Sequence, residues 1–483
     1  MSHRYLPLLF LVAALQPVTA QIPTLLLDIN PTGGSNVSGV TCVNGLLYFS
    51  ADDGIHGSEV WVSDGTSAGT YLLKDINPGA DGSTPYYFMY WQGRAFFSAE
   101  NGVDGFQLWS SDGTEVGTQV ELDINNINGL SASYNYTVYN DMLVFQGWTS
   151  GAHIDLWITD GTEAGTVMVK GFTAGSGQPM GFKEYNGLLY FSALTPSQGR
   201  ELWVTDGTEA GTMLVKDIYW STSYGTPRDL TVANGLLFFR ATNGFWNGAE
   251  LWATDGTEAG TYMVKDIVPG ADGSNPGDLV SFNGEVWFRA YDGSQAKLWH
   301  SDGTEEGTQV FPDPTPSFDM PYNMATHNGE LYFLATNTEG KQLWKTDGTT
   351  DGTSQISYPG STVIDALDLY TSTITSCGDH VFYPATYDAE VGAEFYTLLA
   401  PVGIAEQAAK DQPRLYPSPA TDRLFMSDAP ARATLQLYAS NGALALQADV
   451  QNMDISALPT GLYLARIMAQ DGTLLHVQRV VLN

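Results

Sequence analysis

One phrase recurs through most of the chain, Trp-x-x-Asp-Gly-Thr-x-x-Gly-Thr, and it limits the fold more than any other feature. Its tryptophans are spaced by 48, 48, 46, 49, 47 and 45 residues. They are Trp61, Trp109, Trp157, Trp203, Trp252, Trp299 and Trp344. An eroded eighth copy lies 52 residues after Trp344, with Tyr396 in place of the tryptophan. A repeat of this length is one supersecondary unit, which buries its apolar face only by packing against neighbouring copies.

Each repeat contains four strand-like segments. Around Trp203 they span residues 180–185, 188–193, 201–205 and 213–218, and all are rich in aromatic and branched residues. Asn186-Gly187 joins the first two segments and suits a two-residue hairpin with two positive φ angles. Asp206-Gly207-Thr208 joins the last two, where the carboxylate can accept hydrogen bonds from nearby N–H groups. Such tight connections predict an antiparallel four-stranded meander, which is the blade of a β-propeller.

The number of blades follows from counting the strands. The second strand of the repeat occurs eight times, but only seven fourth strands follow an Asp-Gly-Thr turn. The missing copy is at the N-terminus, because residues 24–31 (Thr-Leu-Leu-Leu-Asp-Ile-Asn-Pro) match residues 71–78 (Tyr-Leu-Leu-Lys-Asp-Ile-Asn-Pro). We therefore predict an all-β chain: an eight-bladed β-propeller with four-stranded blades, the last blade closed by the N-terminal strand, followed by a small C-terminal β-sandwich.

The two cysteines fall at this predicted closure. Cys42 lies in the first strand of the first blade, and Cys377 lies one register position away in the first strand of the eighth. Their side chains then point to opposite faces of equivalent strands, and these faces meet between neighbouring blades. A Cys42–Cys377 disulfide is one interpretation, since export would permit it. Two buried free thiols are the other.

Charge and the N-terminal segment bear on location. The chain has 53 Asp and Glu against 20 Lys and Arg, a formal net charge of −33. This argues against a basic face that binds nucleic acid or an anionic membrane.

The first twenty residues predict a signal peptide over residues 1–20, on the basis of Arg4, the apolar run at 6–15 and the small residues at 18–20. No other stretch approaches eighteen apolar residues, so we expect an exported mature chain without a transmembrane segment.

The C-terminal segment lacks the repeat. After a linker at 401–412, alternating apolar positions return at 413–483 and predict the small β-sandwich. Three motifs follow in order, at residues 415–424, 437–442 and 454–467. They resemble the C-terminal sorting domain of the type IX secretion system of Bacteroidetes, although Ser418 stands where that family usually has Asn. The matching positions include Tyr416, Pro417, Pro419, Asp422, Leu458, Pro459, Gly461 and Tyr463.

This resemblance implies that the type IX machinery is a partner. It implies export across the outer membrane, removal of the domain, and often attachment to surface lipopolysaccharide. An ordinary adhesive β-sandwich is the alternative. Residues 22–399 resemble the bacterial Glu-Leu-Trp-x-x-Asp-Gly-Thr (ELWxxDGT) repeats, which implies a propeller-like secreted or surface protein, predicted over residues 21–400, and no catalytic chemistry.

The many aspartates in turns and loops make calcium the one candidate cofactor. A calcium site needs six to eight oxygen ligands. The repeated aspartates precede Gly-Thr in tight turns with local N–H partners, and a residue present in nearly every blade favours a structural role. They are Asp64, Asp112, Asp160, Asp206, Asp255, Asp302 and Asp347. Weaker calcium candidates are the loop residues Asp52, Asp53, Asp81 and Asp272.

Function in a propeller is expected where blades differ, on the loops of one face. Aromatic residues there either stack on sugars or only fill hydrophobic gaps. These candidates for a ligand face are Tyr86, Tyr87, Trp148, Tyr219, Trp220, Tyr224, Phe245 and Trp246.

No catalytic motif occurs: there is no His-Glu-x-x-His, no Gly-x-Ser-x-Gly and no Walker-type phosphate loop. We expect a secreted or surface-displayed, non-enzymatic propeller that presents a loop face for recognition or adhesion, with glycans or surface proteins as partners. One alternative is a secreted polysaccharide-active enzyme that uses two loop carboxylates. Another is a structural component of a surface layer.

Overall fold

The computed structural model describes residues 23–122, 127, 130–149, 153–172, 177–220, 224–244, 248–312, 314, 317–338, 340–357, 373–387, 393–399, 414–416, 425–427, 434–439, 444–449, 455–468 and 474–482. The chain divides into two compact units, residues 1–400 and 401–483. The predicted signal peptide at 1–20 and the predicted linker at 401–412 lie outside the described residues. No helix in the described part of the chain is long and apolar enough to span a bilayer.

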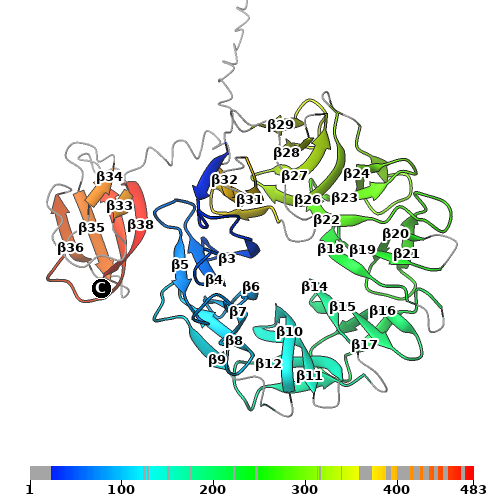
Figure 1. Ribbon diagram of the computed structural model, residues 1–483, viewed down its shortest axis with the longest axis horizontal. Helices are drawn as coiled ribbons and strands as arrows, with labels where there is room; N and C mark the ends of the chain where they lie inside the picture. Colours follow the sequence, from blue (N-terminus) through cyan, green and yellow to red (C-terminus); the bar gives the residue numbers. More distant parts are fainter. Residues whose placement is uncertain are drawn as a thin grey trace, which may run out of the picture. The chain divides into compact units, whose positions relative to one another are not determined.

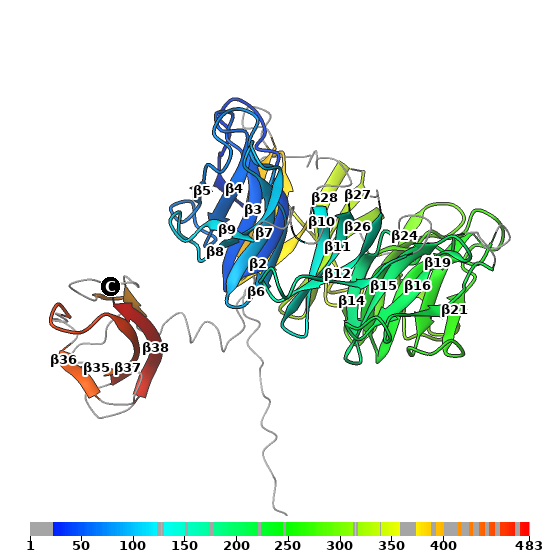
Figure 2. The same ribbon diagram turned by 90° about the horizontal axis from the view of Figure 1, so that it is seen from below.

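The first unit is a ring of eight four-stranded antiparallel sheets (Figure 1, and from the side in Figure 2). This confirms the predicted eight-bladed propeller. Blades 1 to 4, from inner to outer strand, are β2 (Ser38–Val43), β3 (Leu46–Asp52), β4 (Ser58–Ser63) and β5 (Tyr71–Lys74); β6 (Tyr86–Trp91), β7 (Arg94–Glu100), β8 (Phe106–Ser111) and β9 (Gln119–Leu122); β10 (Leu130–Tyr139), β11 (Met142–Thr149), β12 (Ile154–Thr159) and β13 (Val167–Lys170); β14 (Met180–Tyr185), β15 (Leu188–Thr195), β16 (Gly199–Thr205) and β17 (Met213–Lys216).

Blades 5 to 8 follow the same order. They are β18 (Arg228–Ala233), β19 (Leu236–Thr242), β20 (Ala249–Thr254) and β21 (Thr261–Lys265); β22 (Gly277–Phe282), β23 (Glu285–Tyr291), β24 (Ala296–Ser301) and β25 (Gln309–Val310); β26 (Asp319–His327), β27 (Glu330–Asn337), β28 (Gly340–Thr346) and β29 (Ser354–Ile356); β30 (Thr375–Cys377), β31 (His380–Ala385), β32 (Glu394–Leu399) and β1 (Thr24–Leu27).

The hairpins between the first and second strands adopt the backbone that the sequence predicts. Asn186 has φ 50° and Gly187 has φ 76°, and Asn234 and Gly235 have φ 47° and 71°. Two consecutive positive φ angles match the twist of a tight hairpin, and Asn and Gly tolerate them best. The meander within each blade is therefore specified locally by the sequence.

The core consists of apolar layers between neighbouring blades. Leu202 and Val204 of blade 4 pack with Phe239 and Trp252 of blade 5 in one such cluster. The seven repeated tryptophans are at most 9% exposed, which fits their predicted role between blades. Each blade therefore buries its apolar surface only when both neighbours are present, as expected for a repeat array.

The ring is closed in two ways. Strand β1 pairs antiparallel with β32, with Leu25 opposite Tyr396, so the N-terminal strand completes the last blade as predicted. A disulfide joins Cys42 of β2 to Cys377 of β30, with their Cα atoms 5.3 Å apart. Both links connect parts of the chain that are far apart in sequence, and β1 pairs with the edge of β32 that would otherwise be open.

The second unit contains two antiparallel sheets. Strand β33 (Arg414–Tyr416) pairs with β34 (Phe425–Ser427), and a four-stranded sheet has the order β36-β35-β37-β38. The bounds of the latter strands are Leu444–Asp449 for β36, Thr434–Ala439 for β35, Gly461–Met468 for β37 and Leu474–Leu482 for β38. Leu435, Leu437, Ala465 and Ile467 are fully buried. That the two sheets pack as a β-sandwich stays a prediction.

Candidate functional site

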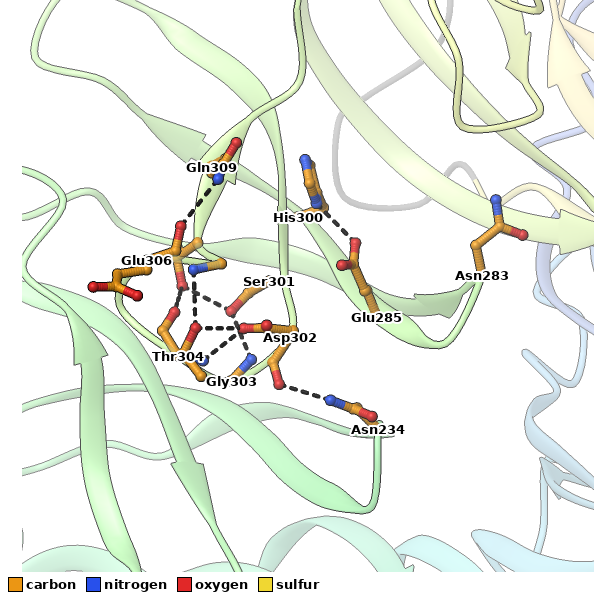
Figure 3. A network of polar contacts seen from close by, with 12 residues as sticks. Asn234, Asn283, Glu285, His300, Ser301, Asp302, Gly303, Thr304, Glu306 and Gln309 are labelled. Atoms are coloured by element: carbon orange, nitrogen blue, oxygen red, sulfur yellow. Dashed lines mark hydrogen bonds and ion pairs between the residues drawn. The ribbon is translucent and has the colours of Figure 1, made fainter.

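The repeated Asp-Gly-Thr turn has the same internal hydrogen bonds in each of the seven blades that contain it, and blade 6 illustrates them (Figure 3). Asp302 Oδ1 accepts hydrogen bonds from the Thr304 N–H and hydroxyl, both at 2.8 Å, and the Thr304 Oγ1 accepts the Gly307 N–H at 2.9 Å. The backbone and hydroxyl donors of Thr304 lower the pKa of Asp302. A side chain at Gly307 would collide with this carboxylate. The repeated aspartate therefore stabilises its own turn, which supports the structural interpretation over calcium binding.

In several blades, the preceding blade also holds this turn in place. Asn234 of blade 5 donates a hydrogen bond to the carbonyl of Asp302 at 2.8 Å (Figure 3). Lys265 Nζ of the outer strand β21 donates to the carbonyl of Thr308 at 2.8 Å, and the Tyr262 hydroxyl donates to that of Gly303 at 3.0 Å. Lys74 makes the equivalent bond to Thr118, and Lys216 to Thr261. These repeated polar residues thus connect neighbouring blades, which supports a structural role for them.

A buried glutamate, which the sequence analysis did not single out, fixes the loops on the opposite face. Glu201, two residues before Trp203, is fully buried. It accepts N–H bonds from Ile218 at 2.8 Å and Gly225 at 2.9 Å, at the two ends of the loop between β17 and β18. Burial raises the pKa of Glu201 to about 7. Glu59, Glu250 and Glu394 hold the corresponding loops of other blades. A charged residue recurring inside an apolar strand was the sequence signal for this role.

Of the calcium candidates, Asp52 ends strand β3 and the other three lie in loops. Asp52 and Asp53 have local partners. Asp52 Oδ1 accepts the Gly54 N–H at 2.8 Å, and Asp53 contacts the His56 ring nitrogen Nδ1 at 2.7 Å. Asp81 and Asp272 occupy equivalent exposed loops before blades 2 and 6. Within the described residues, no group of three or more His, Cys, Asp or Glu side chains could hold a metal ion. Calcium binding at these residues stays a prediction.

The predicted ligand-face aromatics do not all lie in loops. Tyr86 and Tyr87 were expected in a loop, but they begin the inner strand β6, where Tyr86 packs on Phe106 with ring centroids 5.0 Å apart. Tyr87 has φ 57° at a shift in the β6–β7 register, a backbone irregularity that the sequence did not reveal. Trp148 lies in β11, where it pairs in register with Ile154. Phe245 and Trp246 lie outside the described residues.

The loop between β17 and β18 carries the remaining aromatics of the predicted ligand face. Trp220 is 85% exposed and Tyr224 is 53% exposed, while Tyr219 is partly buried. Glu201 holds the backbone of this loop through Ile218 and Gly225, as described above. We call Tyr219, Trp220 and Tyr224 the blade-5 loop aromatics. They combine large exposed apolar rings with a backbone fixed at both ends, so this loop is the candidate binding site.

The sorting-motif residues of the second unit that the structure describes have structural contacts. Tyr463 is 5% exposed, and its hydroxyl donates to the carbonyl of Pro459 at 2.9 Å. The N–H of Leu458 donates to the Ile455 carbonyl at 2.9 Å, forming the turn before β37, whose first residue is Gly461. Tyr416 ends β33. Pro417, Pro419 and Asp422 lie outside the described residues.

Several solved structures are similar to this chain, all at low sequence identity. A computationally designed protein, Ika8, is 12% identical with a TM-score of 0.45, over 78% of this chain and 99% of its own. A prolyl endopeptidase is 11% identical with a TM-score of 0.47, over 92% of this chain but only 56% of its own length. PorZ, described as a surface component of the type IX secretion system of Porphyromonas gingivalis, is 12% identical with a TM-score of 0.25, over 93% of this chain and 82% of its own. Likenesses this weak carry no argument about activity.

The sequence comparison is more specific for the second unit. No curated protein matches the chain. Residues 414–483 match the family described as the secretion system C-terminal sorting domain. This match confirms the sorting domain predicted at 413–483 and implies export through the type IX system. The chain is therefore an eight-bladed β-propeller protein with a type IX sorting domain, secreted or attached to the cell surface.

Proposed function

We propose that the propeller is a non-enzymatic recognition or adhesion module, displayed outside the cell, that binds its ligand at the blade-5 loop aromatics. The single observation that carries this proposal is Trp220, which is 85% exposed on a loop fixed by a buried carboxylate. An indole left in water forgoes the free energy of burial, roughly 1.5–3 kcal/mol for a large apolar side chain. A binding partner that covers the ring would recover it.

The fixed backbone of this loop is a second feature that supports binding, in addition to the exposure of Trp220. Ordering a flexible loop on binding costs about 0.5–1.5 kcal/mol for each immobilised side chain with many rotamers. The loop before β18 is already held at Ile218 and Gly225, and the Thr226 N–H donates to the Arg200 carbonyl at 3.0 Å. The repeated residues are occupied by bonds within and between blades, so the variable loops are the surfaces available for recognition.

The test is a broad glycan array probed with the full chain, in calcium and again in EDTA. We expect discrete binding that Trp220→Ala abolishes. Tyr90→Ala is the matched control, because Tyr90 is 52% exposed on β6 in another blade. Binding that persists in Trp220→Ala, or a blank array in both buffers, contradicts glycan recognition at this loop. Loss of binding in EDTA would support calcium at the acidic loops.

A second candidate, a polysaccharide-active enzyme, is favoured by one pair of carboxylates. Asp229 and Asp278 begin neighbouring inner strands, and burial together with the nearby Asp278 raises the pKa of Asp229. Asp278 Oδ2 lies 3.3 Å from Arg289 Nε. Glycoside hydrolysis uses two neighbouring carboxyl groups, one as the acid and the other as the base or nucleophile. Release of reducing sugar that Asp229→Asn abolishes would support the enzyme, and its absence over a polysaccharide panel would exclude it for those substrates.

A further inference from the structure

Arginine is unevenly distributed in the propeller. Only five arginines occur between residues 21 and 400, in a chain of net charge −33. Arg94 lies in blade 2, and the other four lie in blades 4 to 6: Arg200 in β16, Arg228 in β18, Arg240 in β19 and Arg289 in β23. All four are near the strand ends that lead to or from the same face as the blade-5 loop aromatics.

Two of these arginines replace a small residue of the repeat. The fifth residue of the second strand is a buried serine in blades 1, 2 and 4, namely Ser50, Ser98 and Ser192. In blades 5 and 6 it is Arg240 and Arg289. Arg228 also lies directly opposite Arg240 in the β18–β19 register. Like charges placed directly opposite destabilise a sheet, and a local violation of this kind is typical of functional sites.

Arg200 is buried without a counter-charge. Only 7% of the surface of Arg200 is exposed. Nη1 donates to the Gln178 carbonyl at 2.9 Å and Nη2 to the Gln178 Oε1 at 2.7 Å, and both acceptors are neutral. No carboxylate in the described part of the chain pairs with it, and burial and the neighbouring Arg228 lower its pKa. Buried cations are ordinarily paired because desolvation is costly, so this position favours an anion.

The neighbouring charges leave Arg200 and Arg228 with excess positive charge. Arg289 pairs with Asp278 at 3.3 Å. Arg240 donates to Asn275 Oδ1 at 3.0 Å. Burial lowers the pKa of Arg240, and the nearby Asp229 partly opposes this change. Together, the four arginines and the two aspartates Asp229 and Asp278 carry a formal net charge of +2. Arg228 is exposed, and among the described residues its side chain has no hydrogen bond or ion pair.

The aromatic loop is adjacent to these two arginines. Tyr224 lies close enough to Arg200 to oppose, in part, the lowering of its pKa by burial and by Arg228. The Thr226 N–H donates to the Arg200 carbonyl, so the start of β18 lies beside β16. Aromatic rings accept the C–H face of a sugar, and a guanidinium binds a carboxylate or sulfate through paired N–H donors. The net charge of −33 disfavours a dense polyanion, so the ligand should carry sparse acidic groups.

We propose that Arg200 and Arg228 bind the acidic group, carboxylate or sulfate, of a saccharide whose ring packs on Trp220 or Tyr224. This inference rests on the proposed recognition function and adds the class of ligand. Arg200 supplies a preorganised buried donor, and Arg228 supplies an exposed one that completes the anion site. The two arginines select for charge, while the loop aromatics supply contact area for neutral and acidic sugars alike.

The experiment measures binding of the full chain, by isothermal titration calorimetry at 0.15 M salt, to two matched ligand pairs. An oligosaccharide with a single terminal glucuronic acid is compared with its methyl ester, and a singly sulfated oligosaccharide is compared with its unsulfated form. We expect at least tenfold tighter binding to one or both acidic ligands than to the neutral partner. The pair that shows the preference distinguishes carboxylate from sulfate recognition. Arg228→Gln should weaken acidic binding at least tenfold without altering thermal stability, since Arg228 is exposed.

The controls separate this inference from the proposed function. Arg94→Gln removes the same charge in blade 2 and should leave binding unchanged. Equal affinity for acidic and neutral ligands, or unchanged acidic binding in Arg228→Gln, overturns the inference. If neutral glycans still depend on Trp220, the proposed function stands while the acidic-ligand site fails. Equal Arg228-dependent binding of a glutamate-rich peptide overturns the saccharide assignment, and absence of binding to every acidic ligand overturns the site.

Discussion

The disulfide that closes the ring gives a prediction whose size follows from the structure. Cys42 and Cys377 are 335 residues apart in sequence, and their Cα atoms are 5.3 Å apart. Replacing both by serine removes a crosslink that restricts nearly the whole propeller in the unfolded chain. The folded ring retains its β1–β32 pairing and its apolar layers in the variant.

The chain-entropy estimate for a closed loop of this length is about 6 kcal/mol at 25 °C. Removal of native disulfides usually costs about 2–5 kcal/mol, because the unfolded state retains some structure. We therefore expect Cys42→Ser/Cys377→Ser to lower the free energy of unfolding by about 2–6 kcal/mol. That is a large share of the 5–15 kcal/mol typical of a folded domain.

Equilibrium urea unfolding followed by tryptophan fluorescence measures this change, because the repeated tryptophans are buried in the folded ring. The slope of the unfolding free energy against urea should also rise, since an uncrosslinked unfolded chain exposes more surface. Reducing agent should shift the wild-type curve onto that of the double variant and leave the double variant unchanged.

Two results would refute this reasoning. Alkylation of the denatured wild-type protein at two thiols without prior reduction would show that no disulfide forms. With the disulfide verified by mass, a loss of stability below about 1 kcal/mol would show that the crosslink does not restrict the unfolded chain as argued.

Three further predictions concern the buried carboxylates, the repeated turn and the sorting domain. Burial raises the pKa of Glu201 and Glu394 from 4.5 to about 7, so the folded state binds more protons than the unfolded state between these values. Stability should therefore fall as pH rises from 4.5 to 7, by about 3 kcal/mol per group, and Glu201→Gln should flatten the dependence of melting temperature on pH. Asp206→Ala should lower the urea midpoint of unfolding, because it removes the acceptor of the Thr208 N–H and hydroxyl. Glu209→Ala in the same exposed turn should leave that midpoint nearly unchanged. Deleting residues 414–483 should retain the propeller inside the cell envelope, as cell fractionation and immunoblotting would show; normal release of the truncated chain would contradict the role of the sorting domain.

The sequence predicted features that depend on near neighbours. Asn186-Gly187 specifies a hairpin because few residues tolerate two positive φ angles. Asp302 stabilises its turn through Thr304, two residues away. The irregular start of β6 was not predicted, because the positive φ of Tyr87 arises at a register shift that the residue type does not disclose.

The sequence by itself determined the ring. A period of 45–49 residues, repeated turn chemistry and a displaced outer strand allow one closed eight-bladed arrangement, because each blade needs two neighbours to bury its apolar faces. Only the tertiary structure decided which residues are candidates for binding. Arg200 follows a glycine in an ordinary strand, and nothing nearby in the sequence indicates that its side chain is buried against Gln178 without a carboxylate. The electrostatic environment of a buried charge is set by residues from other strands and blades, and these come together only when the ring is formed.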